Sequence, residues 1–299
     1  MGRPSGRLFG CRMLGFLYIL GSSAAFGFSN AYWKKAIQGK SFLQIIFNRG
    51  LYTTTFFGIC YGLDLRFGLF QHWLGIPPHF PPQQFLLSMG LCIFSAFGLF
   101  FFVRSLKSKA VSLVAPISSI NLFGLLAAVF FLGEHWSITY SIALVCVCGG
   151  VYLVFQKEFQ FKGPRSFFQA FGGSLLSSFF WGISYTLFKY PVAWLGVLPF
   201  TLLLEASVTL LVGLVLFFQN QKREKIPQGP VLILAFSVVL GSTLLHIAYA
   251  TATMTQVIFV SKSQLILTLV FGQILYREKL SKIQWLGIAL LVLSIYVVS

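Results

Sequence analysis

The chain has 299 residues, of which 57% are hydrophobic and 9% are charged, and its mean hydropathy is +0.84. Soluble domains carry about 25% charged residues, so this composition excludes a water-soluble globular protein. The net charge of +16, from 22 basic and 6 acidic residues, would suggest nucleic-acid binding in a soluble protein. Here the basic residues gather in short loops between apolar runs. We therefore expect a lipid bilayer, and no nucleic acid, as partner.

Ten apolar runs are long enough to cross a bilayer, which takes roughly 20 residues. In chain order they are 13–34, 42–63, 85–104, 110–133, 137–155, 167–190, 194–218, 230–251, 255–276 and 281–298. Unpaired backbone groups cannot face lipid, and these runs are too uniformly apolar for barrel strands. The sequence therefore predicts an all-α integral membrane protein with ten transmembrane helices and no soluble domain.

Two motifs occur twice along the chain. Residues 22–35 read SSAAFGFSNAYWKK and residues 177–190 read SSFFWGISYTLFKY, each with two serines before a glycine and a lysine seven positions after it. FLGEHWS at 131–137 corresponds to LYREKLS at 275–281. The repeated order of these motifs indicates that the chain consists of two similar halves.

Each half contains five of the ten runs. We expect the first half at 13–156, a linker at 157–166 and the second half at 167–299. Because five is odd, the second half enters the membrane from the opposite side. Inverted repeats of this kind are typical of secondary transporters, in which two similar halves exchange conformations around a central site.

The motif pairs FGFSNAYWK with WGISYTLFK, and LGEHWS with YREKLSKIQWLGIALLVLSIYVV, resemble the drug/metabolite transporter (DMT) superfamily, specifically its proteins with two EamA domains. The resemblance covers nearly the whole chain and implies a metabolite transporter. It leaves the substrate open, since relatives export amino acids, drugs and other small metabolites. Arg277 stands where the family usually has glycine before Glu278, and Val260 stands where alignment places the proline represented by Pro116.

Charges inside apolar runs are the strongest functional signal. Arg49, Glu205 and Lys262 lie well within the second, seventh and ninth runs. A central charge costs about 2.5–3.5 kcal/mol even on the lenient insertion scale, so each is expected to be paired or to face water. Arg49 and Glu205 occupy nearly corresponding positions of the two halves. They either form a buried ion pair that holds the halves together, or Arg49 and Lys262 attract an anionic group while Glu205 receives a cation or a coupled proton.

Polar residues in neighbouring runs complete a predicted midplane cavity for a small-molecule substrate. The further binding candidates are Asn30, Asn121, Tyr185, His246 and Gln264, with Asn48, Thr53, Ser118, Tyr249 and Ser263 as polar neighbours. Any of them can instead bond across helices. Aromatic residues such as Phe26 and Trp181 would line the same walls. A cavity with both charge signs and aromatic walls suits a small zwitterion better than a hydrocarbon-like drug.

Several motif residues also have structural explanations. Lys34 and Lys189 end their runs, so they either reach to the membrane interface or guard opposite mouths of the pathway as gates. Ser281 and Gln284 have the spacing of a capping box. Glu134 and Glu278 precede runs in which they would complement helix N-termini.

The predicted function is therefore secondary transport of a small polar or zwitterionic, amino-acid-like metabolite by alternating access. The alternatives are an exporter of drugs or toxic cations, or a membrane scaffold without transport. No phosphate loop, HExxH or GxSxG motif is present, so we expect no enzyme, no cofactor and no metal site. We expect a multi-pass protein of a bacterial inner (plasma) membrane, for which a monomer suffices.

Basic residues predict the orientation. The loops after odd-numbered runs, with the adjoining helix ends, hold fifteen of them: Lys34, Lys35, Lys40, Arg104, Lys107, Lys109, Lys157, Lys162, Arg165, Lys222, Arg223, Lys225, Arg277, Lys279 and Lys282. The side of the termini holds five, namely Arg3, Arg7, Arg12, Arg66 and Lys189. Cytoplasmic loops are enriched in Lys and Arg, so the charge count places both termini outside. The resemblance instead implies cytoplasmic termini.

We favour the charge count, because the bias extends over all five odd-numbered loops. A reporter fused after Ser299 that is active only in the cytoplasm should therefore stay inactive, whereas a second reporter inserted in the 219–229 loop should be active. An active reporter after Ser299 would mean that the family orientation holds.

Overall fold

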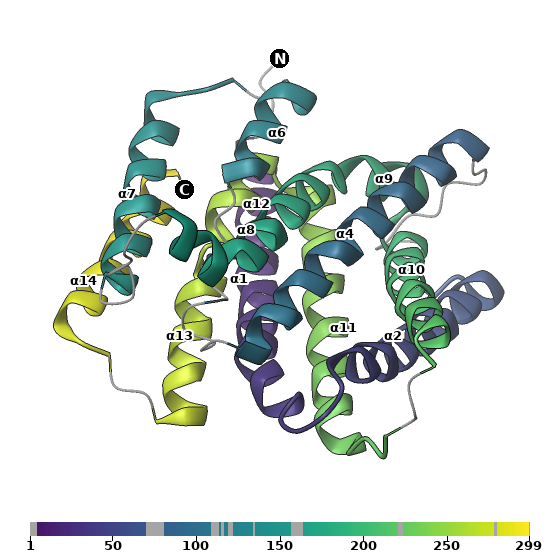
Figure 1. The fold of residues 1–299 in the computed structure, drawn as a ribbon. Coiled ribbons are helices and arrows are strands. Elements are labelled where there is room, and N and C mark those ends of the chain that lie inside the picture. Colours follow the sequence, from purple (N-terminus) through teal and green to yellow (C-terminus); the bar gives the residue numbers. More distant parts are fainter. Residues whose placement is uncertain are drawn as a thin grey trace.

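The computed structural model describes residues 5–69, 81–108, 114, 117–118, 122–133, 135–156, 164–220, 224–277 and 280–298. Within these residues every regular element is helical (Figure 1). Asn121, Pro116, Glu134 and Glu278 lie outside the described residues. The helices of the first half are α1 (Ser5–Ala36), α2 (Phe42–Phe67), α4 (Pro82–Ser108), α6 (Leu122–Leu132) and α7 (Ile138–Phe155). Those of the second half are α8 (Pro164–Leu187), α9 (Lys189–Leu195), α10 (Val197–Phe218), α11 (Gln228–Thr251), α12 (Met254–Val260), α13 (Ser263–Tyr276) and α14 (Lys282–Val298).

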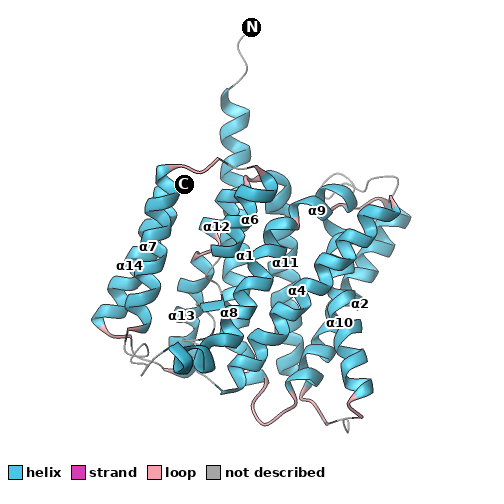
Figure 2. Ribbon diagram, turned by 45° about the horizontal axis from the view of Figure 1, so that its top comes forward, coloured by secondary structure: helices cyan, strands magenta, loops and turns pink. Residues whose placement is uncertain are grey.

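Several of the described helices are long and apolar enough to cross a bilayer. Among the described residues, four segments meet a strict criterion of length and hydropathy: Pro82–Leu106, Val197–Phe218, Gln228–Thr251 and Gln256–Tyr276. Three shorter apolar helices accompany them, at Phe123–Leu132, Ile138–Val154 and Lys282–Val297. Figure 2 shows α1 extending N-terminally beyond the rest of the bundle. This agrees with its 32 residues, which at 1.5 Å per residue exceed a hydrocarbon layer of about 30 Å.

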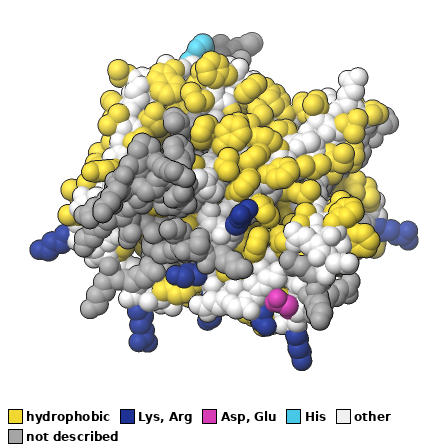
Figure 3. All heavy atoms as spheres, viewed as in Figure 1, with side chains coloured by type: hydrophobic (Ala, Val, Ile, Leu, Met, Phe, Trp, Pro, Cys, Tyr) yellow, Lys and Arg dark blue, Asp and Glu magenta, His cyan; other side chains and the backbone are white. Residues whose placement is uncertain are grey.

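Many large hydrophobic side chains are exposed on the outer surface of the described helices, as expected for helices that face lipid. Phe130, Phe218 and Tyr296 are 78–79% exposed, which a soluble protein would avoid for a whole surface. Figure 3 shows hydrophobic side chains over the upper part of one face, whereas most Lys and Arg side chains in that view lie in its lower half.

Two predicted runs are interrupted in the structure. The ninth run, expected as one continuous helix, is divided into α12 and α13 by a turn at Ser261 and Lys262. The break follows Val260, where no proline marks it. The sixth run continues into the short helix α9, which ends at Gly196 with φ of 84°. At both interruptions the amide groups keep local hydrogen bonds, from Phe188 to the Ser184 carbonyl oxygen at 2.9 Å and from Lys262 to the Phe259 carbonyl oxygen at 3.0 Å.

Helix ends carry some of the predicted features. Ser281 and Gln284 form the capping box before α14, because the Ser281 amide donates to Gln284 Oε1 at 2.8 Å and the Gln284 amide donates to Ser281 Oγ at 3.3 Å. Arg277 ends α13 in the left-handed region with φ of 55°, and Gly133 after α6 has φ of 65°. Arg277 thus adopts the backbone conformation for which the family uses glycine, at a cost in strain.

The helices pair in a pattern that is preserved when the two halves are exchanged. α1 packs along α11 and α13, and α8 packs along α4 and α6 in the corresponding way. α2 packs along α10, and α7 packs along α14, which joins equivalent helices of the two halves. Figure 1 shows α7 and α14 at one edge of the bundle and α2 with α10 toward the other. The two halves therefore interlock rather than lying side by side as separate units.

Two contacts near helix ends show the directions in which α1 and α8 run. Phe42 at the start of α2 packs against Phe100 in the last third of α4, with ring centroids 5.7 Å apart. The α1–α2 junction and the end of α4 thus lie at one end of the bundle. Gly173 in the first half of α8 lies against Ser105 near the end of α4, which places the start of α8 there too. The first helices of the two halves therefore run in opposite directions.

The α7–α14 pair depends on glycine-to-glycine contact. A Cβ atom on Gly150 would lie 2.8 Å from the carbonyl oxygen of Gly287, and one on Gly287 would lie 2.6 Å from the carbonyl oxygen of Gly150. At Gly149, one position away, the nearest atom would be a Leu290 methyl group at an ordinary 3.5 Å. Small residues at the crossing let the two backbones approach, as in other membrane helix pairs.

We expect Gly150→Ala to destabilise the protein by about 1–3 kcal/mol, because the added methyl group meets backbone that cannot move alone. The matched Gly149→Ala variant should be neutral or stabilising by up to about 1 kcal/mol through helix propensity. Thermal unfolding of the two purified variants in detergent measures the difference. Equal stability of the two variants would contradict the close approach at Gly150.

Candidate functional site

A cavity of about 120 Å³ lies between the two halves. Residues of α1, α2 and α4 from the first half, and of α8, α10, α11, α12 and α13 from the second, line it. A single water needs roughly 10–15 Å³ on this scale, so there is room for several waters or for one small solute. All the predicted binding residues that the structure describes line this cavity: Asn30, Arg49, Tyr185, Glu205, His246, Lys262 and Gln264.

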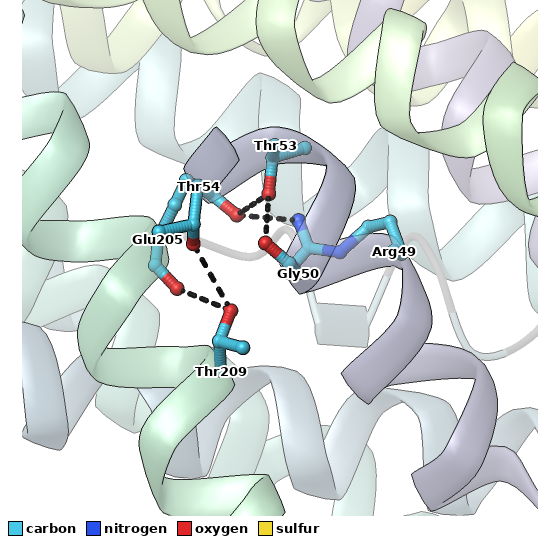
Figure 4. Close-up of polar contacts among 6 residues, drawn as sticks. All are labelled: Arg49, Gly50, Thr53, Thr54, Glu205 and Thr209. Atoms are coloured by element: carbon cyan, nitrogen blue, oxygen red, sulfur yellow. Dashed lines mark hydrogen bonds and ion pairs between the residues drawn. The ribbon is translucent and has the colours of Figure 1, made fainter. Parts of the chain in front are cut away.

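An ion pair between α2 and α10 forms part of the cavity wall. Arg49 Nη1 lies 3.0 Å from Glu205 Oε2, and the two side chains are 3% and 5% exposed. Figure 4 shows the guanidinium group directed toward the Glu205 carboxylate. The sequence placed these residues at nearly corresponding positions of the two halves, and the structure brings them into contact. Because α2 and α10 belong to different halves, the pair also links the halves.

Threonines hold the ion pair in place. Thr53 Oγ1 donates to Glu205 Oε2 at 2.7 Å, and Thr209 Oγ1 donates to the Glu205 carbonyl oxygen at 2.7 Å (Figure 4). Thr54 and Thr209 hydroxyls lie 3.2 Å apart. The Thr53 bond is charge-assisted, which makes it stronger than a neutral one, and it helps to orient the carboxylate, whereas Thr209 bonds the backbone of α10.

Close approach of α2 and α10 requires Gly50. A Cβ atom at this position would collide with Thr209 Oγ1. Sequence reasoning named Thr53 but missed Gly50 and Thr209. The spacing of Thr201, Glu205 and Thr209 by four residues was the available signal, because it places three polar side chains on one face of α10.

The guanidinium of Arg49 uses only part of its bonding capacity. Its Nε and Nη2 atoms are buried and have no hydrogen-bond partner among the residues that the structure describes. Ser118 also lines the cavity, and its buried hydroxyl likewise has no hydrogen-bond partner among the described residues. Unsatisfied buried donors cost about 1–3 kcal/mol each, and more when charged, so such groups call for a ligand or water.

Lys262 lies in the turn between α12 and α13 and is 5% exposed. Together with Arg49 and Glu205 it lines the cavity. The charged groups of the described cavity wall are therefore two cations and one anion. The turn between α12 and α13 thus places a lysine in the cavity wall.

His246 is hydrogen-bonded to α10. Its Nδ1 atom lies 2.6 Å from Thr201 Oγ1, which also lies 2.6 Å from the Val197 carbonyl oxygen. The hydroxyl has one proton for these two partners, so the tautomer of the ring decides which of them receives it. Since Thr201 and Glu205 are one turn apart on α10, the histidine and the ion pair are neighbours along the same helix face.

Aromatic rings form part of the cavity wall, and two of them pack against glycines. Trp181 stacks on Tyr185 with ring centroids 5.8 Å apart and packs against Gly98 of α4. In the other half, Phe26 packs against Gly241 of α11, where an added Cβ would meet its ring at 3.1 Å. Phe26 and Trp181 occupy corresponding motif positions, so both halves place an aromatic ring over a glycine of the opposite half. The glycines were not predicted.

The two gate candidates lie near helix ends, outside the cavity wall formed by the described residues. Lys34 Nζ lies 5.6 Å from the centre of the Tyr276 ring, near the end of α1. Lys189 begins α9, directly after α8. Because α1 and α8 run in opposite directions, the lysines lie toward opposite ends of the bundle.

Comparison with known proteins gives a family and a fold. A family model described as the EamA-like transporter family matches residues 13–156 and 170–299. No curated protein matches the chain. A solved structure titled only "Crystal structure of protein" is similar over 96% of this chain and 95% of its own, with 14% sequence identity and a TM-score of 0.68. At this identity the similarity shows a shared fold.

The Gly50–Thr209 contact generates a test of the α2–α10 interface. We expect Gly50→Ala to lower stability by about 1–3 kcal/mol, since the new methyl group forces Thr209 and α10 away. Thr209→Ala alone should cost about 1 kcal/mol through its lost hydrogen bond. The double variant should unfold at a higher temperature than Gly50→Ala alone. If Gly50→Ala is as stable as the unaltered protein, the close approach is wrong.

Proposed function

Since the chain belongs to the EamA-like transporter family and is a membrane transporter of the DMT superfamily, we propose that it is a secondary transporter of a small polar or zwitterionic, amino-acid-like metabolite. The observation that carries this proposal is the cavity between the two halves, whose wall combines Arg49, Glu205 and Lys262 with aromatic rings. A solute with polar ends and a short apolar part is complementary to such a wall.

We propose ten membrane crossings in two inverted halves. α8 with α9, and α12 with α13, would each make one crossing, and the fourth would end with α6. The opposite directions of α1 and α8 support inversion, as does a pairing of helices that is preserved on exchange of the halves. Alternating access follows if the halves exchange conformations around the cavity. The site of action would be a bacterial inner membrane, with a monomer as the working unit.

Glu205 is the proposed site of proton coupling. It is the acidic residue among the described cavity-lining residues, and it is paired with Arg49 across the interface between halves. Protonation of Glu205 would remove the attraction between α2 and α10, and this would link its charge to the relative position of the halves. An inward-directed pH gradient would then change the direction or rate of flux.

A second candidate function is export of cationic drugs, which Glu205 and the rings Trp181 and Tyr185 favour in part. Saturable flux in proteoliposomes, with competition by amino acids, nucleosides and cationic drugs, separates the candidates. Competition by amino acids would support the first function, and competition by cations alone would support the second. A membrane scaffold would give no saturable flux at all.

Transport in these proteoliposomes should fall at least about tenfold for Glu205→Gln and for Lys262→Met, because each removes a charge from the cavity wall. The matched control is Lys225→Met, which removes an exposed lysine from the α10–α11 loop. Elution as folded protein in detergent is checked first for all three variants, because Glu205→Gln leaves Arg49 without its charged partner. Normal flux of both cavity variants would mean that these charges serve only the structure.

The lysine gates give a test of sidedness. In a cysteine-free background, Lys34→Cys and Lys189→Cys should be labelled by an impermeant maleimide from opposite sides of the membrane, because they lie toward opposite ends of the bundle. Intact cells and inverted vesicles supply the two sides. Labelling of both positions from one side would overturn the inverted arrangement.

A further inference from the structure

The guanidinium group of Arg49 presents an unused edge. Glu205 engages only Nη1, at 3.0 Å, whereas Nε and Nη2 are buried and have no partner among the described residues. Nε and Nη2 each have an N–H bond that lies in the guanidinium plane, and these two bonds point in parallel from the same edge of the group. This edge is a fork that matches the two oxygens of a carboxylate.

The fork belongs to a residue that is fixed in place. Thr53 and Arg49 both bind Glu205 Oε2, at 2.7 Å and 3.0 Å, so the carboxylate that holds Nη1 is itself held. Arg49 is 3% exposed. A guanidinium held by one nitrogen has little freedom to turn its other edge toward a new partner, so the direction of the fork is set before a ligand arrives. Such preorganisation reduces the cost of binding.

The charge of the surroundings favours an anion. Arg49 and Lys262 are the lysine and arginine residues of the described cavity wall, and Glu205 is its acidic residue, already paired with Arg49. The buried Ser118 hydroxyl supplies a further donor without a partner among the described residues. In a weakly polar interior an anionic group is attracted to this wall, and it would also satisfy buried donors that otherwise cost stability.

On the basis of the proposed transport function, we propose that the Nε–Nη2 edge of Arg49 binds a carboxylate group of the transported solute, while Glu205 acts as the positioning residue that keeps this edge available. The solute is thus a small organic carboxylate rather than a neutral or purely cationic compound. A planar group with two oxygens fits the planar fork, and the remainder of the solute lies against the aromatic wall that Trp181 and Tyr185 form together.

Binding to the purified protein tests the assignment without requiring flux. Thermal unfolding in detergent is followed with matched pairs that differ only at the carboxyl group: propionate and propionamide, alanine and alaninamide, phenylalanine and phenylalaninamide. At least one carboxylate should raise the unfolding temperature in a saturable manner, and its amide should bind at least about tenfold more weakly, because the amide carries no charge at this group.

Arg49→Lys keeps the positive charge but has no fork, so it should lose at least about tenfold in carboxylate affinity. The control is Arg66→Lys, which alters an exposed arginine of the same helix, α2, and should bind like the unaltered protein. If Arg49→Lys does not fold, the comparison of carboxylates with amides on the unaltered protein still decides. Equal binding of both members of every pair, or no stabilisation by any carboxylate, would overturn the assignment.

The two proposals fail in different ways. Carboxylate binding that depends on Arg49, without saturable flux in proteoliposomes, would reject transport and keep the carboxylate site. If nucleosides or cations show saturable flux, and carboxylates neither inhibit this flux nor are transported themselves, the transport function stands and the carboxylate site is rejected.

Discussion

The ion pair of Arg49 and Glu205 is the contact on which the architecture of the cavity depends. Two charges in an apolar interior are tolerated only when they are paired and hydrogen-bonded, because desolvation costs several kcal/mol per ion. Their 3.0 Å contact requires that α2 and α10 lie close together, and Gly50 and Thr209 meet that requirement. Thr53 then satisfies a further lone pair of the carboxylate, and Thr209 bonds the main-chain carbonyl oxygen of Glu205 within α10.

Exchange symmetry explains why the cavity lies at the centre. The first helix of each half packs against a helix of the other half, α1 on α11 and α8 on α4. Neither half can therefore bury its polar motif alone. Residues of both copies of the repeated motif face this shared space: Ser22, Ser23 and Phe26 of the first copy, and Trp181 and Tyr185 of the second, line the cavity. The two copies of the motif therefore form one cavity wall together, and neither copy forms it alone.

Much of the fold could be predicted from the sequence, because lipid imposes simple rules on apolar length and charge. The helical class, the charged residues of the cavity wall and the Ser281–Gln284 capping box were all recognisable locally. The break after Val260 was not, because its usual signal is proline and none is present. Gly98 and Gly241 were missed for a different reason. Each matters through an aromatic ring that is distant in the sequence, and a single sequence contains no record of such pairs.

Sequence reasoning left two roles open for Arg49, a structural ion pair or an anion site, and treated them as alternatives. The geometry makes them compatible, since an arginine has two edges and Glu205 occupies one nitrogen only. A lysine in the same place would have to share a single ammonium group between carboxylate and solute. The structural pair and the proposed recognition of solute therefore draw on different atoms of one side chain. The Arg49–Glu205 contact that joins the halves then also orients the group that is proposed to bind the solute. A change in the relative position of the halves would therefore change solute binding, and solute binding would change the position of the halves.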